Sequence, residues 1–218
     1  MTADKVGSCL LVSTDEVGRP LRLCRLRESF WNLYVKGCDE HYLAHILRDH
    51  SDFIPEMNYV AVYDERIVGN IMYTKSYVID DKGNKADTLT FGPLCVLPEF
   101  QRKGIGTLLI NRTKEIALQK GAGAIIILGH PRNYCRHGFK NCKDYNVSDT
   151  EGRYPFGQLV LELKKDFFAG RKWKFHYSSA YHVDENLVRV FDEQFPLKEK
   201  LYRPTQEEFS IACRAYLE

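Results

Sequence analysis

The chain has 218 residues, of which 44% are hydrophobic and 28% are charged, an ordinary globular composition with ample material for a core. Its formal net charge of +2 is too close to balance to favour a nucleic-acid partner, and no apolar run approaches the roughly 18 residues of a membrane span. The seven cysteines form no C-x-x-C pair, and the N-terminal apolar stretch is too short for a secretory signal. We therefore expect reduced thiols in a cytoplasmic protein.

The first fifty residues predict a small hairpin and two short helices. Residues 8–12 and 21–26 are short apolar runs separated by DEVGR, which indicates a hairpin. Residues 28–50 have the pattern of two short helices broken near Gly37, and Asp39 is a candidate N-cap for the second.

A longer hairpin is expected next. The segment 58–80 reads as two strands joined by a tight turn at 64–66, and DKGNK at 81–85 forms a second turn. Residues 87–97 then predict another strand, which ends at Pro98 because proline has no backbone N–H to donate.

A helix and a buried strand follow. Four apolar side chains fall on one helical face: Ile105, Leu108, Leu109 and Ile116. Lys120 and Gly121 form a helix-stop signal, and the unbroken apolar run at 124–128 is typical of a strand buried in a parallel sheet. Residues 87–128 therefore predict a βαβ crossover.

The C-terminal third has weaker patterns. Residues 158–163 predict a strand, and residues 184–195 predict a helix. T-x-x-E at 205–208 is a capping-box pattern that would open a last helix reaching Glu218. Basic and aromatic residues alternate at 170–179, which favours a strand with one buried face over a nucleic-acid surface.

Two glycines lie where the central helix must begin. Gly104 and Gly106 would expose backbone N–H groups at a helix N-terminus, which binds anions, and Arg102 and Lys103 add positive charge there. A Walker P-loop is excluded because its lysine follows the glycine, and a Rossmann fingerprint is excluded because the third glycine position is Leu109. These residues alone leave two interpretations open, a phosphate site and a structural turn.

The longer motif LCVLPEFQRKGIGTLLI resembles the pyrophosphate-binding motif of the GNAT superfamily of acetyl-CoA-dependent N-acyltransferases. Gln101, Gly104 and Gly106 match the fixed positions of that motif, and Val96 and Pro98 match the preceding strand end.

A second motif has the expected order and spacing. In NYCRHGF, Tyr134, Gly138 and Phe139 match the tyrosine and Gly-Phe pair that often end the family's core. The resemblance implies an α/β fold with a mixed, largely antiparallel central sheet flanked by helices, including a βαβ acyl-CoA-binding unit. We expect residues 1–150 to form this domain and 151–218 to be an extension packed on it.

The resemblance also implies a reaction, the transfer of acetyl from acetyl-CoA to an amine. The pantetheine arm would pair with the strand, the pyrophosphate would bind at the glycine turn, and the N–H of Val96 would polarise the thioester carbonyl. Tyr134 would act as the general acid toward the leaving sulfur. The cofactor-binding residues implied in this way are Leu94, Cys95, Val96, Gln101, Arg102, Lys103, Gly104, Ile105, Gly106 and Thr107.

The general base and the acceptor are not given by the motifs. The position where some members carry a carboxylate base is Thr90, Glu99 lies past the strand where it can brace the turn, and His130 begins a short helix. The acceptor is expected to be a small amine rather than a protein. The resemblance is also compatible with a homodimer, because members of the family often dimerise. The rival function is a non-catalytic acyl-CoA sensor, which would not need Tyr134.

No metal site is predicted. His41 and His45 stand one helical turn apart, but the glutamate of a zincin motif is replaced by Tyr42. We expect these two histidines to lie on an exposed helix face.

Overall fold

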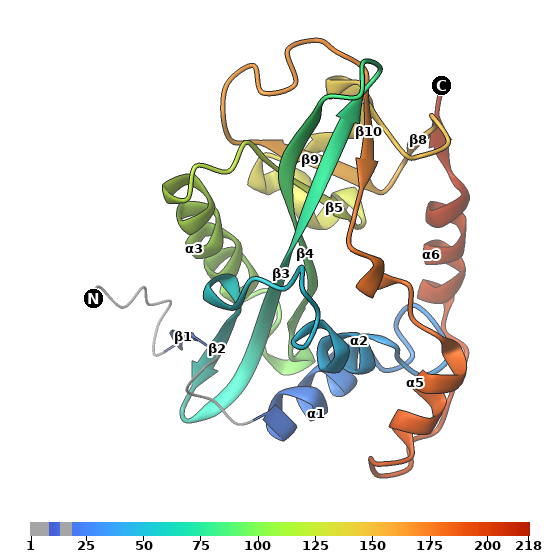
Figure 1. Ribbon diagram of the computed structural model, residues 1–218. Helices are drawn as coiled ribbons and strands as arrows, with labels where there is room; N and C mark the ends of the chain where they lie inside the picture. Colours follow the sequence, from blue (N-terminus) through green and yellow to red (C-terminus); the bar gives the residue numbers. More distant parts are fainter. Residues whose placement is uncertain (1–8, 14–18) are drawn as a thin grey trace.

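The computed structural model describes residues 9–13 and 19–218, and Figure 1 shows a twisted sheet with helices on both sides. The strands are β1 (Cys9–Ser13), β2 (Tyr59–Tyr63), β3 (Arg66–Asp80), β4 (Lys85–Val96), β5 (Ala124–Leu128), β6 (Lys140–Asn141), β7 (Val147–Ser148), β8 (Tyr154–Pro155), β9 (Gln158–Glu162), β10 (Trp173–His176) and β11 (Tyr216–Leu217). The helices are α1 (Arg19–Phe30), α2 (Glu40–Leu47), α3 (Ile105–Gln119), α4 (Pro131–Tyr134), α5 (Glu185–Asp192) and α6 (Pro204–Arg214).

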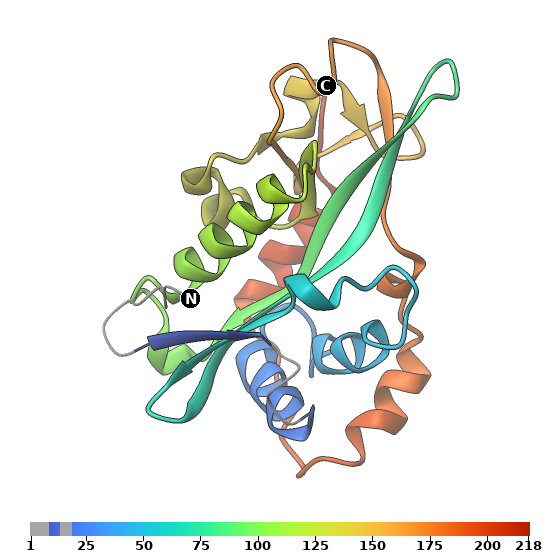
Figure 2. The same ribbon diagram turned by 60° about the vertical axis from the view of Figure 1, so that its left-hand side comes forward.

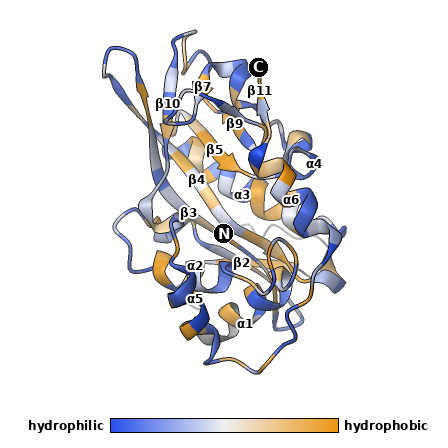
Figure 3. Ribbon diagram, turned by 90° about the vertical axis from the view of Figure 1, so that its right-hand side faces the viewer, coloured by the Kyte–Doolittle hydropathy of each residue, from blue (hydrophilic) through white to orange (hydrophobic). Residues whose placement is uncertain are grey.

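The central sheet has the order β1-β2-β3-β4-β5-β9-β6, and β10 pairs with β3 and with β7 beside this path. Most of its pairs are antiparallel, whereas β4 and β5 run parallel because α3 connects them. The predicted α/β class, the mixed and largely antiparallel sheet, and the βαβ unit are therefore confirmed. Figure 3 shows that β4 and β5, in the middle of the sheet, are largely hydrophobic.

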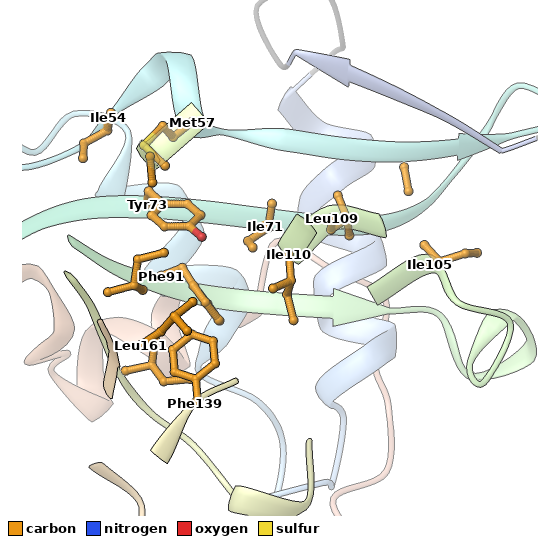
Figure 4. Packing of buried hydrophobic residues seen from close by; sticks show 14 of the residues in the cluster. Ile54, Met57, Ile71, Tyr73, Phe91, Ile105, Leu109, Ile110, Phe139 and Leu161 are labelled. Carbon is orange, nitrogen blue, oxygen red and sulfur yellow. The ribbon is translucent and has the colours of Figure 1, made fainter. Parts of the chain in front are cut away.

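The helices on the two faces of the sheet are separated in the chain. Figure 2 shows α3 on one face, with α1 and α2 on the other. The main core cluster lies under α3, where Leu109 and Ile110 meet Ile71 and Phe91 (Figure 4). A second cluster joins α1 and α2 to the opposite face of β3 and β4. The C-terminal part of β4 is therefore held between two packed layers.

Buried polar contacts also fix α3 on the sheet. The hydroxyl groups of Tyr73 on β3 and Thr113 on α3 are 3.0 Å apart, and both side chains are fully buried. Thr113 Oγ1 also lies 2.8 Å from the carbonyl oxygen of Leu109, one turn earlier in the helix. A buried, paired hydroxyl is costly to misplace, so this contact holds the helix in one position along the strand.

The predicted N-terminal hairpin is wrong. β1 pairs with β2, and residues 21–26 lie in α1 instead of a second strand. The intervening turn falls mostly outside the described residues. The buried side chains Leu23, Leu26 and Phe30 follow helical spacing, and they pack against α2.

Several predictions for the C-terminal third are confirmed. The strand at 158–163 is β9, and the helix at 184–195 is α5, whose N-cap Asp184 accepts a hydrogen bond from Asn186 N at 2.7 Å. β10 buries Trp173 and Phe175 while Lys174 is exposed, as expected for a strand with one buried face.

The predicted capping box is wrong. α6 begins at Pro204 and ends at Arg214, and the Thr205 hydroxyl donates a hydrogen bond to the carbonyl of Leu33 instead of capping the helix. A short strand, β11, follows α6 and pairs with β8.

Residues 185–214 pack against the first two helices and the loop between them. Arg27 on α1 donates two hydrogen bonds to Asp192 on α5, at 2.6 and 3.2 Å. Gln206 on α6 donates to the carbonyls of Asn32 and Val35. Polar contacts of this kind fix α5 and α6 beside the face of the sheet that carries α1 and α2.

Candidate active site

The two parallel strands of the βαβ unit separate along their length. Among the described residues, β4 pairs with β5 at one position, Leu89 with Ile125. Beyond Leu89, β4 continues to Val96 and pairs with β3 alone, while β5 pairs with β9 on its other edge. The last part of β4 therefore has one backbone edge that β5 does not use.

The hydrogen bonds at the end of β4 show which backbone groups lie on that edge. Leu97 N donates to Val68 O of β3 at 2.9 Å. Because neighbouring residues of a strand direct their backbone groups to opposite edges, those of Val96 and Leu94 point away from β3. Gln101 Nε2 donates to the Val96 carbonyl at 3.1 Å, in agreement with this orientation. Cys95 lies opposite Asn70, and its own backbone groups point toward β3.

The turn that follows β4 ends in the N-terminus of α3. Gly104 adopts a left-handed conformation with φ +84°, and the Leu108 N–H donates to its carbonyl at 2.9 Å. The N–H groups of residues 105–107 precede that first helical bond, so they have no partner within the helix. Arg102, also left-handed at φ +58°, and Lys103 are both exposed here. This arrangement favours an anionic ligand.

Gly106 is not required by the packing of the chain. A Cβ at this position would lie 3.8 Å from Val96 Cγ2, an ordinary contact, and the residue lies in regular helix. Neither conformation nor a neighbouring side chain demands a glycine there. A ligand that approaches the first turn of α3 closely would account for it.

Tyr134 lies at the end of α4, a helix that starts where the sequence predicted it. His130 Nδ1 accepts a hydrogen bond from Arg132 N at 3.2 Å, so His130 caps the helix. The Tyr134 ring packs against Phe91 of β4 and against Phe139, with ring centroids 5.7 and 6.0 Å apart. The ring of Tyr134 therefore packs on β4, the strand whose C-terminal part has a backbone edge that β5 does not use.

The environment of Tyr134 favours the protonated phenol. Burial is the main cause that raises the pKa of Tyr134, and the nearby Tyr34 raises it further. Gly129 leaves room for the ring, because a Cβ there would lie 2.5 Å from Tyr134 Cε2. A phenol that keeps its proton at neutral pH can serve as a proton donor.

The other sequence candidates are buried or pair with neighbouring side chains. Glu99 is exposed and pairs with Arg66 at 3.3 Å, so it braces the turn after β4. Thr90 is buried on β4. His41 is fully buried with its Nε2 3.2 Å from Asp192 Oδ1, and burial lowers its pKa to about 4. The expectation of an exposed His41 was wrong because α5 covers that face of α2.

The described residues contain no group of three or more His, Cys, Asp or Glu side chains that could hold a metal ion. Within the same residues, no helix is both long and apolar enough to cross a bilayer.

Known proteins share the sequence pattern and the fold of this chain. The model of the acetyltransferase (GNAT) family matches residues 23–139, more than half of the chain. The chain belongs to the GNAT family. The resemblance drawn from the two motifs is thereby confirmed.

Individual GNAT relatives support the assignment at the level of sequence and fold. An Escherichia coli K12 protein named uncharacterized N-acetyltransferase YjhQ is 34% identical over 102 residues, which are 46% of this chain and 54% of that protein. The match thus spans about half the length of that relative. The E. coli GNAT protein YhbS, solved with CoA, has a TM-score of 0.68 at 21% identity and covers 84% of this chain and 97% of its own. A Brucella melitensis GNAT acetyltransferase, solved with acetyl-CoA, has a TM-score of 0.56 at 21% identity and covers 79% and 97%.

One residue that sequence reasoning missed lies near this GNAT site. Glu40 begins α2, and its carboxylate acts electrostatically on Cys95 of β4 and on Tyr34. No motif marks it, because its proximity to β4 depends on how the loop between α1 and α2 folds back.

Proposed function

We propose that the chain is an N-acetyltransferase that moves acetyl from acetyl-CoA to an amine by direct attack. The observation that carries this proposal is the free edge of β4, with the Val96 backbone directed away from β3, next to the N-terminus of α3. A pantetheine arm could pair with Leu94 and Val96 while its pyrophosphate meets the N–H groups after Gly104. The relatives solved with CoA and acetyl-CoA support this choice of cosubstrate.

In the proposed reaction, the Val96 N–H stabilises the oxyanion that forms on the thioester carbon. The acceptor nitrogen forms the new C–N bond, the C–S bond breaks, and the CoA thiolate leaves. Tyr134 gives its proton to that sulfur, and its phenolate regains a proton from water, because both the thiol, with a pKa of about 8.5, and the phenol are protonated at neutral pH. The position of Tyr134 against Phe91 of β4 supports this role.

We propose a small amine as the acceptor. α6 lies against the loop after α1, where Phe209 and Tyr34 have ring centroids 4.7 Å apart. On the side of the sheet that carries α1 and α2, helix α6 thereby leaves less room for an acceptor to reach β4. We also propose that residues 1–150 supply the reacting groups and that 151–218 complete the same domain, because α5 and α6 contact α1 and the loop after it.

The test is a screen of amines with acetyl-CoA, in which free thiol is measured and acetylated products are identified by mass. The proposal predicts amine-dependent thiol release and a product heavier by one acetyl group. Tight acetyl-CoA binding with no turnover for any amine would instead support the non-catalytic sensor function.

A further inference from the structure

A carboxyl group lies partly buried at the start of α2. Glu40 Oε2 accepts hydrogen bonds from the Cys38 thiol at 3.3 Å and from the Asp39 N–H at 3.2 Å. Asp39, the predicted cap, makes no side-chain capping bond. Asp39 is still the N-cap residue of α2, and the two hydrogen bonds hold the carboxylate of Glu40, the first helical residue, in a defined orientation.

Within residues 9–13 and 19–218, no Lys, Arg or His side chain forms an ion pair with Glu40. Burial is the main cause that raises the pKa of Glu40 to about 7, and the charge of Asp39 adds to it. A positively charged ligand would stabilise the partly buried carboxylate of Glu40, because the ligand would supply an ion-pair partner.

The position of Glu40 relates it to the acyl group. Its hydrogen-bond partner Cys38 lies in the same buried cluster as Cys95, the residue of β4 between Leu94 and Val96. The carboxylate also acts on the Cys95 thiol and on Tyr34. Glu40 is thus on the face of β4 that carries α1 and α2, opposite the face of α3 where the pyrophosphate would bind (Figure 2). An acceptor that binds on this face would lie on the side of β4 where Glu40 stands.

We propose that Glu40 binds the ammonium group of the acceptor and accepts its proton before attack. This inference rests on the proposed acetyl transfer. The carboxylate takes one proton from R–NH3+ and later releases it to water, which leaves R–NH2 free to attack. A second N–H proton leaves the nitrogen for water when the C–N bond is complete, and the Tyr134 phenolate takes one proton back from water, which balances the proton that it gave to sulfur.

The same geometry selects a class of acceptor. Glu40 and Asp39 place two carboxyl groups at the entry of α2. A carboxylate next to the reacting amine would be repelled there, whereas an alkyl ammonium would be attracted. The acceptor class is therefore a basic primary amine without an adjacent acid group.

The pH dependence has a defined sign. Glu40 must be deprotonated to act, so kcat/KM should rise as pH increases through about 7. The titratable groups that interact with Glu40 are Cys38, Asp39, Tyr34 and Cys95. His41 follows Glu40 on α2, and Glu185 and Lys200 act on Asp39. Burial raises the pKa of the Cys38 and Cys95 thiols and of the Tyr34 phenol, and it lowers that of His41. None of these four groups should therefore cause the rise in kcat/KM near pH 7.

The experiment measures thiol release from acetyl-CoA with two matched pairs, tyramine and tyrosine, and histamine and histidine. The wild type should prefer the amine of a pair at least tenfold over its amino acid. Glu40→Gln should lower kcat/KM about 10²–10⁴-fold at pH 7, lose the limb near pH 7, and keep the acetyl-CoA affinity. The deficit should shrink at high pH, where the amine is already neutral.

Glu28→Gln is the matched control, since it removes an exposed carboxylate of α1 that pairs with Arg25 at 3.0 Å, and it should keep the plateau rate. A wild-type pH profile and rate in a folded Glu40→Gln protein, or a preference for the amino acids, would overturn the role of Glu40 and leave the acetyltransferase proposal intact. Absence of thiol release by the wild type with every amine would overturn both.

Discussion

Replacement of Gly104 by alanine separates backbone strain from cofactor binding. Gly104 stands at the N-cap of α3 with φ +84° and ψ −5°, a conformation in which a side chain costs about 1–2 kcal/mol. Beyond this strain, we expect the new methyl group to hinder the close approach of a phosphate to the N–H groups of residues 105–107. We expect the affinity for acetyl-CoA to fall at least tenfold, or about 1.4 kcal/mol.

Gly121 offers a matched control at the other end of the same helix. It is left-handed as well, at φ +74°, and a Cβ there would lie no closer than 3.7 Å to the Lys164 Nζ. Gly121→Ala should therefore lower the free energy of unfolding by a similar amount while acetyl-CoA binds as in the wild type. Calorimetric titration of both folded variants with acetyl-CoA gives the two affinities to compare. Wild-type affinity in Gly104→Ala, or an equal loss in both variants, would refute the placement of the phosphates.

Three further predictions concern stability. Asp192→Asn removes the charged partner of Arg27, which is only 4% exposed, and should lower the free energy of unfolding by about 3 kcal/mol in a denaturant titration; an unchanged value would mean that the pair contributes little. Six cysteines of the described residues are free, so melting curves with and without reductant should coincide, and a large drop on reduction would contradict this. The folded-state pKa of Glu40 is raised from 4.5 to about 7. The free energy of unfolding of the wild type should therefore fall as pH rises from about 4.5 to 7, by up to about 3 kcal/mol relative to Glu40→Gln. Parallel plots of the free energy of unfolding against pH for the two proteins would contradict the burial of this carboxyl.

The βαβ unit could be predicted from the sequence because its signals are local. The apolar face of α3, the glycines before it and the apolar run of β5 each identify an element without knowledge of the rest of the chain. The hairpin of β2 and β3 was predictable for the same reason, since its turn at Asp64 and Glu65 separates two strands of strong β propensity.

The errors arose where distant segments decide the local structure. Residues 21–26 form an apolar run too short to separate strand from helix, and their helical state depends on packing against α2. His41 is buried because α5, about 150 positions later in the chain, covers it. Thr205 binds the carbonyl of Leu33 instead of capping α6. Nothing in the pattern near each residue reports these contacts.

The candidate site follows the same division. Gln101, Gly104 and Gly106 were predictable because a motif of fixed spacing carries them, and the structure places them at the end of β4 and the start of α3. Glu40 was not, because the raised pKa and the proximity to Cys95 come from the folded loop.

The most direct test of the account is kcat for Tyr134→Phe, measured as thiol release with whichever amine supports turnover. The substitution keeps the ring against Phe91 and removes the acid, so kcat should fall about 10²–10⁴-fold while acetyl-CoA affinity stays unchanged. Tyr145→Phe is the control, because burial also raises the pKa of Tyr145 but its ring packs on Phe168, away from β4, and its kcat should match the wild type. A Tyr134→Phe protein that turns over as fast as the wild type would contradict the role of Tyr134 as proton donor.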